Sequence, residues 1–376
     1  MDAPNPMKDA LPFTPSTMLA PMEGVTDPLF REVMAERPGL GVVCTEFVRI
    51  SRAPIRAVHL RAEVVKIPGV PLSVQIMGND ADCMADAAGI VSEAGADIVD
   101  INLGCPTRKA SKNGVGAAML KDPDLLYKVL SSMRARVPGC LSAKIRAGWD
   151  DATHILAIAQ AIEAAGANFI VVHPRLRTDA FKGVADWRIV AALKSQISIP
   201  VIGNGDCWYA APALHLQKAM QCDGIMIGRP ALRNPWIFQQ MAQIRSAETP
   251  VHPDGAMVAA FLHDLMGRFC AALHVPTAPI GRMKEIIGWV GRAIDDDRLF
   301  LRQALRAKSI QEIQVIIDTM IAPLPAHAID MHSEGLLQLE KCPENSDKNT
   351  EFSAVSRHPC AVSSHVHKSH VTRTDF

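Results

Sequence analysis

The feature that most constrains the fold is an alternation of short apolar runs and longer helical segments along roughly the first 230 residues. Eight β-branched runs recur, and the apolar residues between them are spaced as on one face of a helix. This alternation predicts parallel strands joined by right-handed crossovers, and eight units of this length predict a closed (β/α)8 barrel, the TIM barrel. The predicted strands are Met18–Ala20, Val42–Cys44, Leu72–Ile76, Ile98–Ile101, Leu141–Ile145, Phe169–Val172, Pro200–Ile202 and Gly224–Ile227.

Helical segments are predicted between these strands, and two of them end in the same way. Gly95 and Gly166 each follow an alanine and precede a strand, so each can supply the left-handed residue that ends a helix. An open doubly wound sheet is the alternative fold, but it calls for a G-x-G-x-x-G turn after the first strand, where Ala20–Gly24 stands instead. The predicted helices are Cys83–Ala94, Leu125–Arg136, Ile155–Ala165 and Ala210–Met220.

The pattern changes after Met241–Pro253, where helices follow one another without strands. We therefore predict a flexible N-terminus at residues 1–15, a barrel at 16–245, a small helical bundle at 254–322 and a disordered tail at 327–376. The tail is rich in Ser, His, Lys and Asn and lacks apolar periodicity. Its irregularly spaced histidines do not predict a metal site; they are His358, His365, His367 and His370. The bundle helices are predicted at Ala256–Ala272, Gly281–Ile294, Leu299–Ala307 and Ile310–Ile321.

Composition excludes several classes of protein. The 39 basic and 39 acidic residues balance, so a site for a polyanion has to be local. Nine cysteines without a C-x-x-C pair predict neither a disulfide framework nor a zinc site, and favour the reducing cytoplasm. We find no export signal, no apolar stretch of the roughly 18 residues that a membrane span needs, and no sign of a stable protein partner.

Polar side chains and glycines stand at the C-terminal ends of the predicted strands. In a (β/α)8 barrel these ends form one surface, which carries the functional groups. Each residue alone has a structural explanation, such as a solvated strand end or a tight turn, but their coincidence at seven strand ends predicts one site. The residues are Pro21, Met22, Thr45, Glu46, Gln75, Asn102, Cys105, Lys144, Arg146, His173, Arg175, Asn204, Gly205, Asp206, Gly228 and Arg229.

The chemistry of these residues describes a site for flavin mononucleotide, FMN. The turns Gly203–Asp206 and Ile227–Pro230 follow the last two strands, where barrels commonly bind phosphate through backbone N–H groups and an arginine. Lys144 and His173 can meet the polar edge of a planar cofactor, and Gln75 offers a donor and an acceptor. Cys105 lies in a turn after the fourth strand, although a free cysteine is commonly only a small buried hydrophobe.

With these residues in view, the chain resembles the tRNA-dihydrouridine synthases over roughly Met18–Met320. The run Thr45–Arg49 is most similar to the bacterial C subgroup, which reduces uridine 16 of the D-loop. Pro174 replaces a glycine that is usual in the family, and Leu176–Phe181 departs from its usual loop, where a tyrosine is common. The motifs that carry the resemblance are Leu19–Asp27, Val74–Gly78, Asn102–Pro106, Val172–Arg175, Pro200–Asp206 and Met226–Arg229.

This resemblance implies an activity and a role for each site residue. A flavin reduced by NADPH passes hydride to C6 of a uracil lifted out of tRNA, and Cys105 donates a proton to C5 as the catalytic residue. Asn102, Glu46 and Arg175 bind the substrate. FMN is held by Pro21, Met22, Gln75, Lys144, His173, Asn204, Gly205, Asp206, Gly228 and Arg229.

The helical bundle grips tRNA in this family, and the resemblance implies RNA contacts at Arg282, Lys284 and Arg292. A second possibility for the basic residues of the bundle is a solvated face paired with the acidic residues Asp295–Asp297. Two other functions remain open at this point. One is an FMN barrel that reduces a free pyrimidine or another small molecule, and the other is a tRNA-binding protein without catalysis.

Overall fold

The computed structural model describes residues 10–51, 56–275, 277–294 and 298–334. Eight of its strands form a closed parallel barrel, in which β1 pairs with β2 and β9 and a β2–β4 pairing closes the ring. This confirms the predicted fold. The barrel strands are β1 (Thr17–Leu19), β2 (Val42–Cys44), β4 (Leu72–Met77), β5 (Ile98–Leu103), β6 (Cys140–Gly148), β7 (Phe169–Leu176), β8 (Val201–Asn204) and β9 (Gly224–Ile227).

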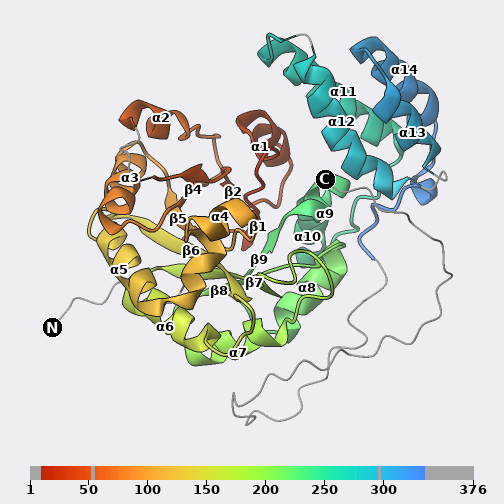
Figure 1. The fold of residues 1–376 in the computed structure, drawn as a ribbon. Helices are drawn as coiled ribbons and strands as arrows, with labels where there is room; N and C mark the ends of the chain where they lie inside the picture. The colour runs from red at the N-terminus through yellow and green to blue at the C-terminus, as the bar shows by residue number, and fades with distance from the viewer. Residues whose placement is uncertain (1–9, 52–55, 276, 295–297, 335–376) are drawn as a thin grey trace. The chain divides into compact units, whose positions relative to one another are not determined.

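Helices surround the barrel strands (Figure 1). Aspartates cap several of them: the Asp27 and Asp122 carboxylates accept backbone N–H groups in the first turns of α1 and α5. Gly95 and Gly166 have φ of +100° and +87°, as the predicted helix ends require. The helices are α1 (Pro28–Ala35), α2 (Ala57–Ala62), α3 (Ala81–Glu93), α4 (Arg108–Lys112), α5 (Pro123–Arg134), α6 (Ile155–Ala164), α7 (Arg188–Gln196), α8 (Ala210–Ala219), α9 (Arg229–Arg233) and α10 (Ile237–Arg245).

The barrel interior is filled by buried side chains from most of the barrel strands. Met18, Phe169, Ile202 and Met226 belong to this buried cluster, and Phe13 packs edge-on against Phe169 with 5.8 Å between ring centroids. Residues 10–15 are therefore part of the packed structure, which corrects the prediction of a flexible segment there; residues 1–9 lie outside the described residues. A two-residue strand that was not predicted, β3 (Val48–Arg49), pairs with β4.

The segment after α10 consists of helices, as predicted. They are α11 (Gly255–Ala272), α12 (Ala278–Val290), α13 (Leu299–Arg306) and α14 (Ile310–Met320). Their buried faces meet through residues such as Phe269, Ile286, Phe300 and Ile313. α11 packs against α1, and α12 packs against α9, so these helices are joined directly to the barrel.

The chain remains ordered after α14, which corrects the predicted start of the tail. Ile329 forms an antiparallel bridge with Ile294, and the carbonyl of Met331 accepts a hydrogen bond of 2.6 Å from Gln240 Nε2. Met331 is fully buried. The predicted disordered tail from residue 335 onward, with its four histidines, lies outside the described residues. None of the helices in the described part has the length and apolar character needed to cross a membrane.

Candidate active site

A cavity of about 380 Å³ opens at the C-terminal ends of the barrel strands. Twelve of the sixteen strand-end residues of the predicted site line it: Pro21, Met22, Asn102, Cys105, Lys144, Arg146, His173, Asn204, Gly205, Asp206, Gly228 and Arg229. The other four, Thr45, Glu46, Gln75 and Arg175, are not part of this lining. The closed ring of strands therefore brings together residues that are separated by more than 200 positions in the chain.

Cys105 lies on a short turn that Asn102 holds. Asn102 Oδ1 accepts the backbone N–H groups of Gly104 at 3.0 Å and of Cys105 at 2.9 Å. On the other side of the turn, Gly116 has φ of +63°, and a Cβ there would lie 2.9 Å from the Cβ of Cys105. The Cys105 side chain also packs against Val115, with Sγ 3.4 Å from Thr107 Oγ1. The thiol is therefore confined from several directions.

Gln75 lies beneath the cavity rather than on its wall. Its side chain is 1% exposed and joins two other residues of the β4–β5 pair. Gln75 Nε2 donates to Asp100 Oδ2 at 2.6 Å, and Gln75 Oε1 accepts from Asn102 Nδ2 at 2.7 Å. Burial raises the pKa of Asp100 to about 6, against the hydrogen bonds of Ser142 and Gln75.

Lys144 and His173 bring a cation and a neutral ring to one wall. Burial, with a further contribution from Arg146, lowers the pKa of Lys144 to about 8. Burial and the nearby positive charges of Lys144 and Arg146 lower the pKa of His173 far below its ordinary value. Arg175 Nη1 lies 3.2 Å from His173 Nε2. Because a guanidinium only donates, Nε2 is the acceptor and Nδ1 carries the proton of the neutral ring.

Arg175, for which a substrate contact was predicted, is bound by residues of the protein in this structure. Its side chain is 3% exposed, and Nη2 lies 2.8 Å from each carboxylate oxygen of Asp206. Arg175 also donates to the carbonyls of Lys182 and Gly183. With His173, these partners take four of the five N–H groups of the guanidinium, so Arg175 fixes His173 and Asp206 in place.

Arg146 lines the cavity as well, although we assigned it no role from the sequence beyond its strand-end position. Its Nε donates to the carbonyl of Gly104 at 2.8 Å, and Nη1 donates to the carbonyl of Ala180 at 2.8 Å. Burial, with the charge of Arg175, lowers its pKa to about 10. Phe181, with 54% of its surface exposed, lies between the guanidinium groups of Arg146 and Arg229, 5.4 Å and 4.6 Å from its ring centroid. Arg146 therefore joins the cysteine turn to the loop that carries Phe181.

The two glycine turns form a cradle that side chains would fill. A Cβ at Gly205, where φ is +126°, would lie 3.1 Å from His173 Cδ2. A Cβ at Gly228 would lie 3.4 Å from the Cβ of Ala20 and 3.6 Å from the sulfur of Met22. Arg229 begins α9 directly after Gly228. Open backbone beside an arginine fits a phosphate group. No group of side chains suited to hold a metal ion occurs among the described residues.

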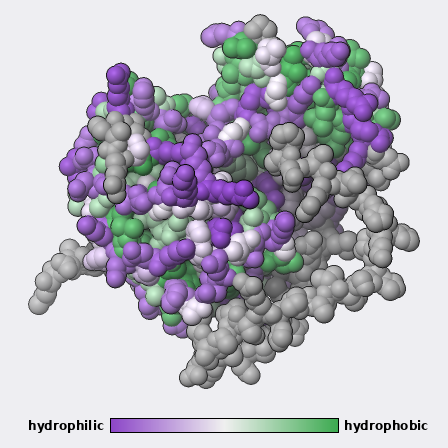
Figure 2. Space-filling view, viewed as in Figure 1, coloured by the Kyte–Doolittle hydropathy of each residue, from purple (hydrophilic) through white to green (hydrophobic). Residues whose placement is uncertain are grey.

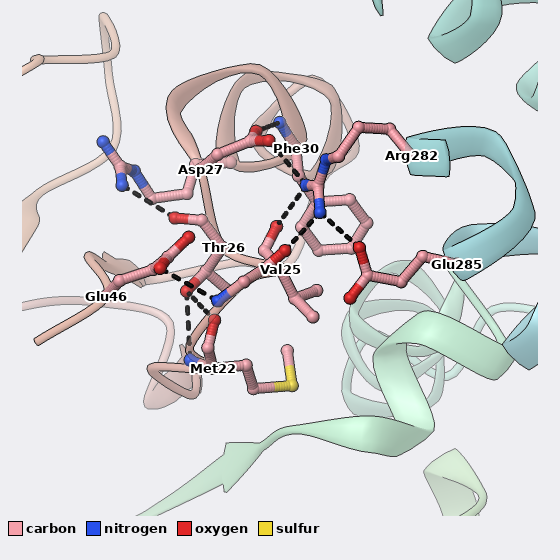
Figure 3. A network of polar contacts seen from close by, with 10 residues as sticks. Met22, Val25, Thr26, Asp27, Phe30, Glu46, Arg282 and Glu285 are labelled. Atoms are coloured by element: carbon pink, nitrogen blue, oxygen red, sulfur yellow. Dashed lines mark hydrogen bonds and ion pairs between the residues drawn. The ribbon is translucent and has the colours of Figure 1, made fainter. Parts of the chain in front are cut away.

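Arg282, for which an RNA contact was predicted, is bound to the protein itself. Figure 3 shows its guanidinium beside the segment between β1 and α1. It donates to Asp27 Oδ2 at 2.5 Å, to the carbonyls of Gly24 and Val25, and to Glu285. Its side chain is 18% exposed. Arg282 therefore ties α12 to the segment that follows the first barrel strand.

Glu46 supports the same segment from the opposite side, where a substrate contact was predicted. Glu46 Oε2 accepts the backbone N–H of Gly24 at 2.9 Å (Figure 3). Thr26 Oγ1 accepts the N–H of Met22 at 3.0 Å. Because Met22 lines the cavity, Glu46 and Arg282 both act on the cavity wall through this segment.

Basic residues lie close in sequence to the cavity lining in two segments of the chain. Arg292 is exposed and lies over the Trp289 ring at 4.3 Å, and Trp289 itself lines the cavity. No carboxylate pairs with Arg292 or Lys284 within the ranges that the structure describes. A second group was missed because it lies beyond the strand end: α4, directly after the cysteine turn, exposes Arg108, Lys109 and Lys112. Hydrophilic side chains gather over this region of the surface in Figure 2.

Comparisons with known proteins agree with this geometry. Residues 18–285 match the family model described as dihydrouridine synthase (Dus). A "Probable tRNA-dihydrouridine synthase" of Rhodobacter capsulatus is 37% identical over 262 residues, covering 68% of this chain and 80% of the relative. A "tRNA-dihydrouridine(16) synthase" of Aquipseudomonas alcaligenes is 30% identical over 308 residues, covering 80% of this chain and 98% of the relative.

A "tRNA-dihydrouridine synthase B" of Pseudomonas syringae pv. tomato is 40% identical over 226 residues, covering 60% of this chain and 67% of the relative. Among solved structures, a morphinone reductase mutant in complex with tetrahydroNAD has a TM-score of 0.44 and 12% identity, covering 64% of this chain and 89% of that one. The family match runs from the first barrel strand into α12, across every strand that contributes to the cavity. The chain belongs to the dihydrouridine synthase family.

Proposed function

We propose that this protein reduces a uridine of tRNA to 5,6-dihydrouridine, with FMN as the resident cofactor and NADPH as the reductant. The observation that carries the proposal is the cavity itself. It places the Cys105 thiol, the Lys144 ammonium and a neutral His173 on walls that meet a glycine cradle beside Arg229. The family of the chain and the names of its relatives support the same activity.

The residues present fit FMN. The cradle at Gly205 and Gly228, with Arg229, would hold its phosphate, and Lys144 would meet the polar edge of its ring system. His173 stays neutral and is fixed in one tautomer by Arg175, so it can donate one directed hydrogen bond from Nδ1. When bound, the flavin supplies hydride for the reduction.

Cys105 is the proposed general acid, which delivers a proton from Sγ to C5 of the uracil. Asn102 holds the turn that aims this thiol, and the amide hydrogen of Asn102 not used by Gln75 can bond the edge of the base. Arg146, whose Nε bonds the same turn, places a positive charge near the thiolate that proton transfer leaves. Lifting the base from a loop costs less than lifting it from a stacked helix, so a D-loop uridine suits this site.

We further propose uridine 16 of the D-loop as the target and the cytoplasm as the place of action. The proposed target is supported by the share of this chain that each group of relatives covers. Relatives named tRNA-dihydrouridine(16) synthase match about 80% of this chain, beyond the barrel, at 29–30% identity. Relatives named synthase B have higher identities, 36–40%, but over 60–69% of the chain.

RNA contacts are proposed at Lys284 and Arg292 of the helical segment and at Arg108, Lys109 and Lys112 of α4. Arg292 lies over Trp289, and α4 follows Thr107; Trp289 and Thr107 both line the cavity. None of the five cations is paired with a carboxylate within the described ranges, so they are available to phosphates. A surface of this kind favours tRNA over a free pyrimidine, which would need no charged rim.

The test is to incubate the purified protein and NADPH with tRNA that lacks dihydrouridine, and to map reduced uridines by position. The Cys105→Ala variant is the matched control; it should keep its yellow flavin and bind tRNA but form almost no product. Reduction confined to position 16 is expected, and reduction elsewhere would reject the proposed target. A yellow protein that reduces free uracil but not tRNA would favour the small-molecule alternative, and a colourless protein that binds tRNA would favour the non-catalytic one.

A further inference from the structure

Three side chains stand side by side across neighbouring strands beneath the cavity. Gln75 on β4 is paired in register with Asp100 on β5, and Asp100 is paired with Ser142 on β6. Ser142 Oγ donates to Asp100 Oδ1 at 2.6 Å, and Gln75 Nε2 donates to Asp100 Oδ2 at 2.6 Å. All three side chains are buried. Both oxygens of a buried carboxylate are therefore used, although the proposed chemistry gives Asp100 no role.

The row continues to the cysteine turn. Gln75 Oε1 accepts from Asn102 Nδ2, and Asn102 Oδ1 accepts the backbone N–H groups of Gly104 and Cys105. Asn102 is two residues after Asp100 on the same strand, so its side chain lies on the same face. A continuous path of hydrogen bonds thus runs from Asp100 to the backbone of the residue that carries the thiol.

The two ends of this path impose one direction on it. Backbone N–H groups only donate, so Asn102 has to turn its oxygen toward the cysteine turn and its nitrogen toward Gln75. Gln75 then turns its side-chain oxygen toward Asn102 and its side-chain nitrogen toward Asp100. An ionised carboxylate only accepts, so Asp100 is the end group that satisfies this arrangement. A donor at position 100 would favour the reversed amides, which would bring N–H against N–H at the turn.

We propose that Asp100 is a positioning residue that fixes the orientation of the Gln75 and Asn102 amides and thereby holds the Cys105 turn in the cavity wall. The proposal rests on the proposed role of Cys105 as the acid. It also gives a reason for burying a carboxylate, which is costly unless the charge is hydrogen-bonded. Ser142 donates to the other oxygen of the same carboxylate and is not part of the hydrogen-bond path through the two amides. A Ser142 variant therefore weakens the hydrogen bonding of the buried charge without changing the orientation of the Gln75 and Asn102 amides.

The test compares Asp100→Leu, which removes the acceptors but keeps the number and branching of the side-chain heavy atoms, with Asp100→Asn, which keeps an oxygen but permits the reversed amides. Ser142→Ala is the matched control. The first readout is the rate at which iodoacetamide alkylates Cys105 in the full-length protein without tRNA, followed on the Cys105 peptide by mass spectrometry. The exposed Cys270 is the internal reference. In Asp100→Leu the turn should be released, and the alkylation rate of Cys105 should rise about ten-fold. This factor corresponds to the loss of one or two net hydrogen bonds that hold the turn.

Asp100→Asn should show a rise of about three-fold, and Ser142→Ala should stay within about two-fold of the wild type, because it leaves the amide path intact. The second readout is tRNA reduction, in which kcat should fall in both Asp100 variants while KM for tRNA and the bound flavin are retained. Wild-type alkylation and kcat in both Asp100 variants would overturn the proposal, as would an equal effect of Ser142→Ala. If Asp100→Leu does not fold, Asp100→Asn decides by the same criteria. A wild-type protein that never reduces tRNA would reject the proposed function, while the alkylation rates would still decide whether Asp100 holds the turn.

Discussion

Replacing Arg282 by methionine should destabilise the fold without removing an RNA contact. Methionine keeps an apolar stem against Phe269, which the Arg282 guanidinium overlies at 5.4 Å, and removes the donors. The substitution leaves Asp27 and Glu285 without their cation and two backbone carbonyls without a donor. The substitution therefore weakens the contact between α12 and the segment after β1.

The size of the effect follows from the exposure of the partners. The side chains of Arg282, Asp27 and Glu285 are 18%, 28% and 36% exposed, so each contact lies between a surface pair and a buried one. Surface pairs contribute at most about 1 kcal/mol and hydrogen bonds to charged groups about 1.5–3 kcal/mol. We assign about 1.5 kcal/mol to the Asp27 contact, about 1 kcal/mol to the two carbonyls together and about 0.3 kcal/mol to the Glu285 pair within one helix. The sum is about 3 kcal/mol, or a fall in Tm of about 6–12 °C at the 2–4 °C per kcal/mol of larger domains.

The assay is thermal unfolding of the Arg282→Met protein, together with tRNA affinity at low and high salt. Lys284→Met is the matched control, because Lys284 lies on the same helix without a carboxylate partner in the described ranges. Arg282→Met should lower Tm and weaken tRNA binding equally at both salt concentrations. Lys284→Met should leave Tm unchanged and weaken tRNA binding less as salt rises, since phosphate contacts act through counterion release. An unchanged Tm in Arg282→Met with a salt-dependent loss of affinity would refute the reasoning and restore Arg282 as an RNA contact.

Four further predictions concern the cavity and its surroundings. Gly116→Ala should lower kcat by at least about ten-fold, because the new Cβ meets Cys105 at 2.9 Å in a backbone conformation that alanine rarely adopts; wild-type turnover would contradict this. FMN affinity of the flavin-free protein should fall as pH rises through about 8, where Lys144 loses its proton, and Lys144→Met should abolish that titration. The depressed Lys144 pKa also makes this group destabilise the flavin-free fold below about pH 8, and that penalty should disappear as pH rises toward the unfolded value of 10.5, measurable as a gain in unfolding free energy that Lys144→Met lacks. Replacing Arg108 and Lys112 of α4 together by serine should weaken tRNA binding at low salt and reduce the salt dependence of binding, with Tm unchanged; affinity equal to the wild type at low salt would remove α4 from the RNA surface.

The barrel could be predicted because its signals are local. A strand buried on both faces is an apolar run, and the glycines at 95 and 166 end their helices through their own backbone conformation. The two-residue strand β3 was missed because Val48 and Arg49 form it only by pairing with the end of β4. The order of residues 327–334 was missed for a similar reason: Ile329 and Met331 are buried by partners far away in the chain.

By itself, the sequence determined the succession of strands and helices, the polar residues at the strand ends and the resemblance to one family. Each of these depends on residues that are close together in the chain. It could not assign each residue its partner. Arg282 and Lys284 look alike as basic residues of one helix, and only the tertiary structure brings Asp27, 255 positions away, to the first and not to the second. The same holds for Asp100, whose place under the cysteine turn depends on the register of β4, β5 and β6. The physical reason is that the energy of a charged or polar group depends on what surrounds it in space, and that surrounding exists only once the ring of strands has closed.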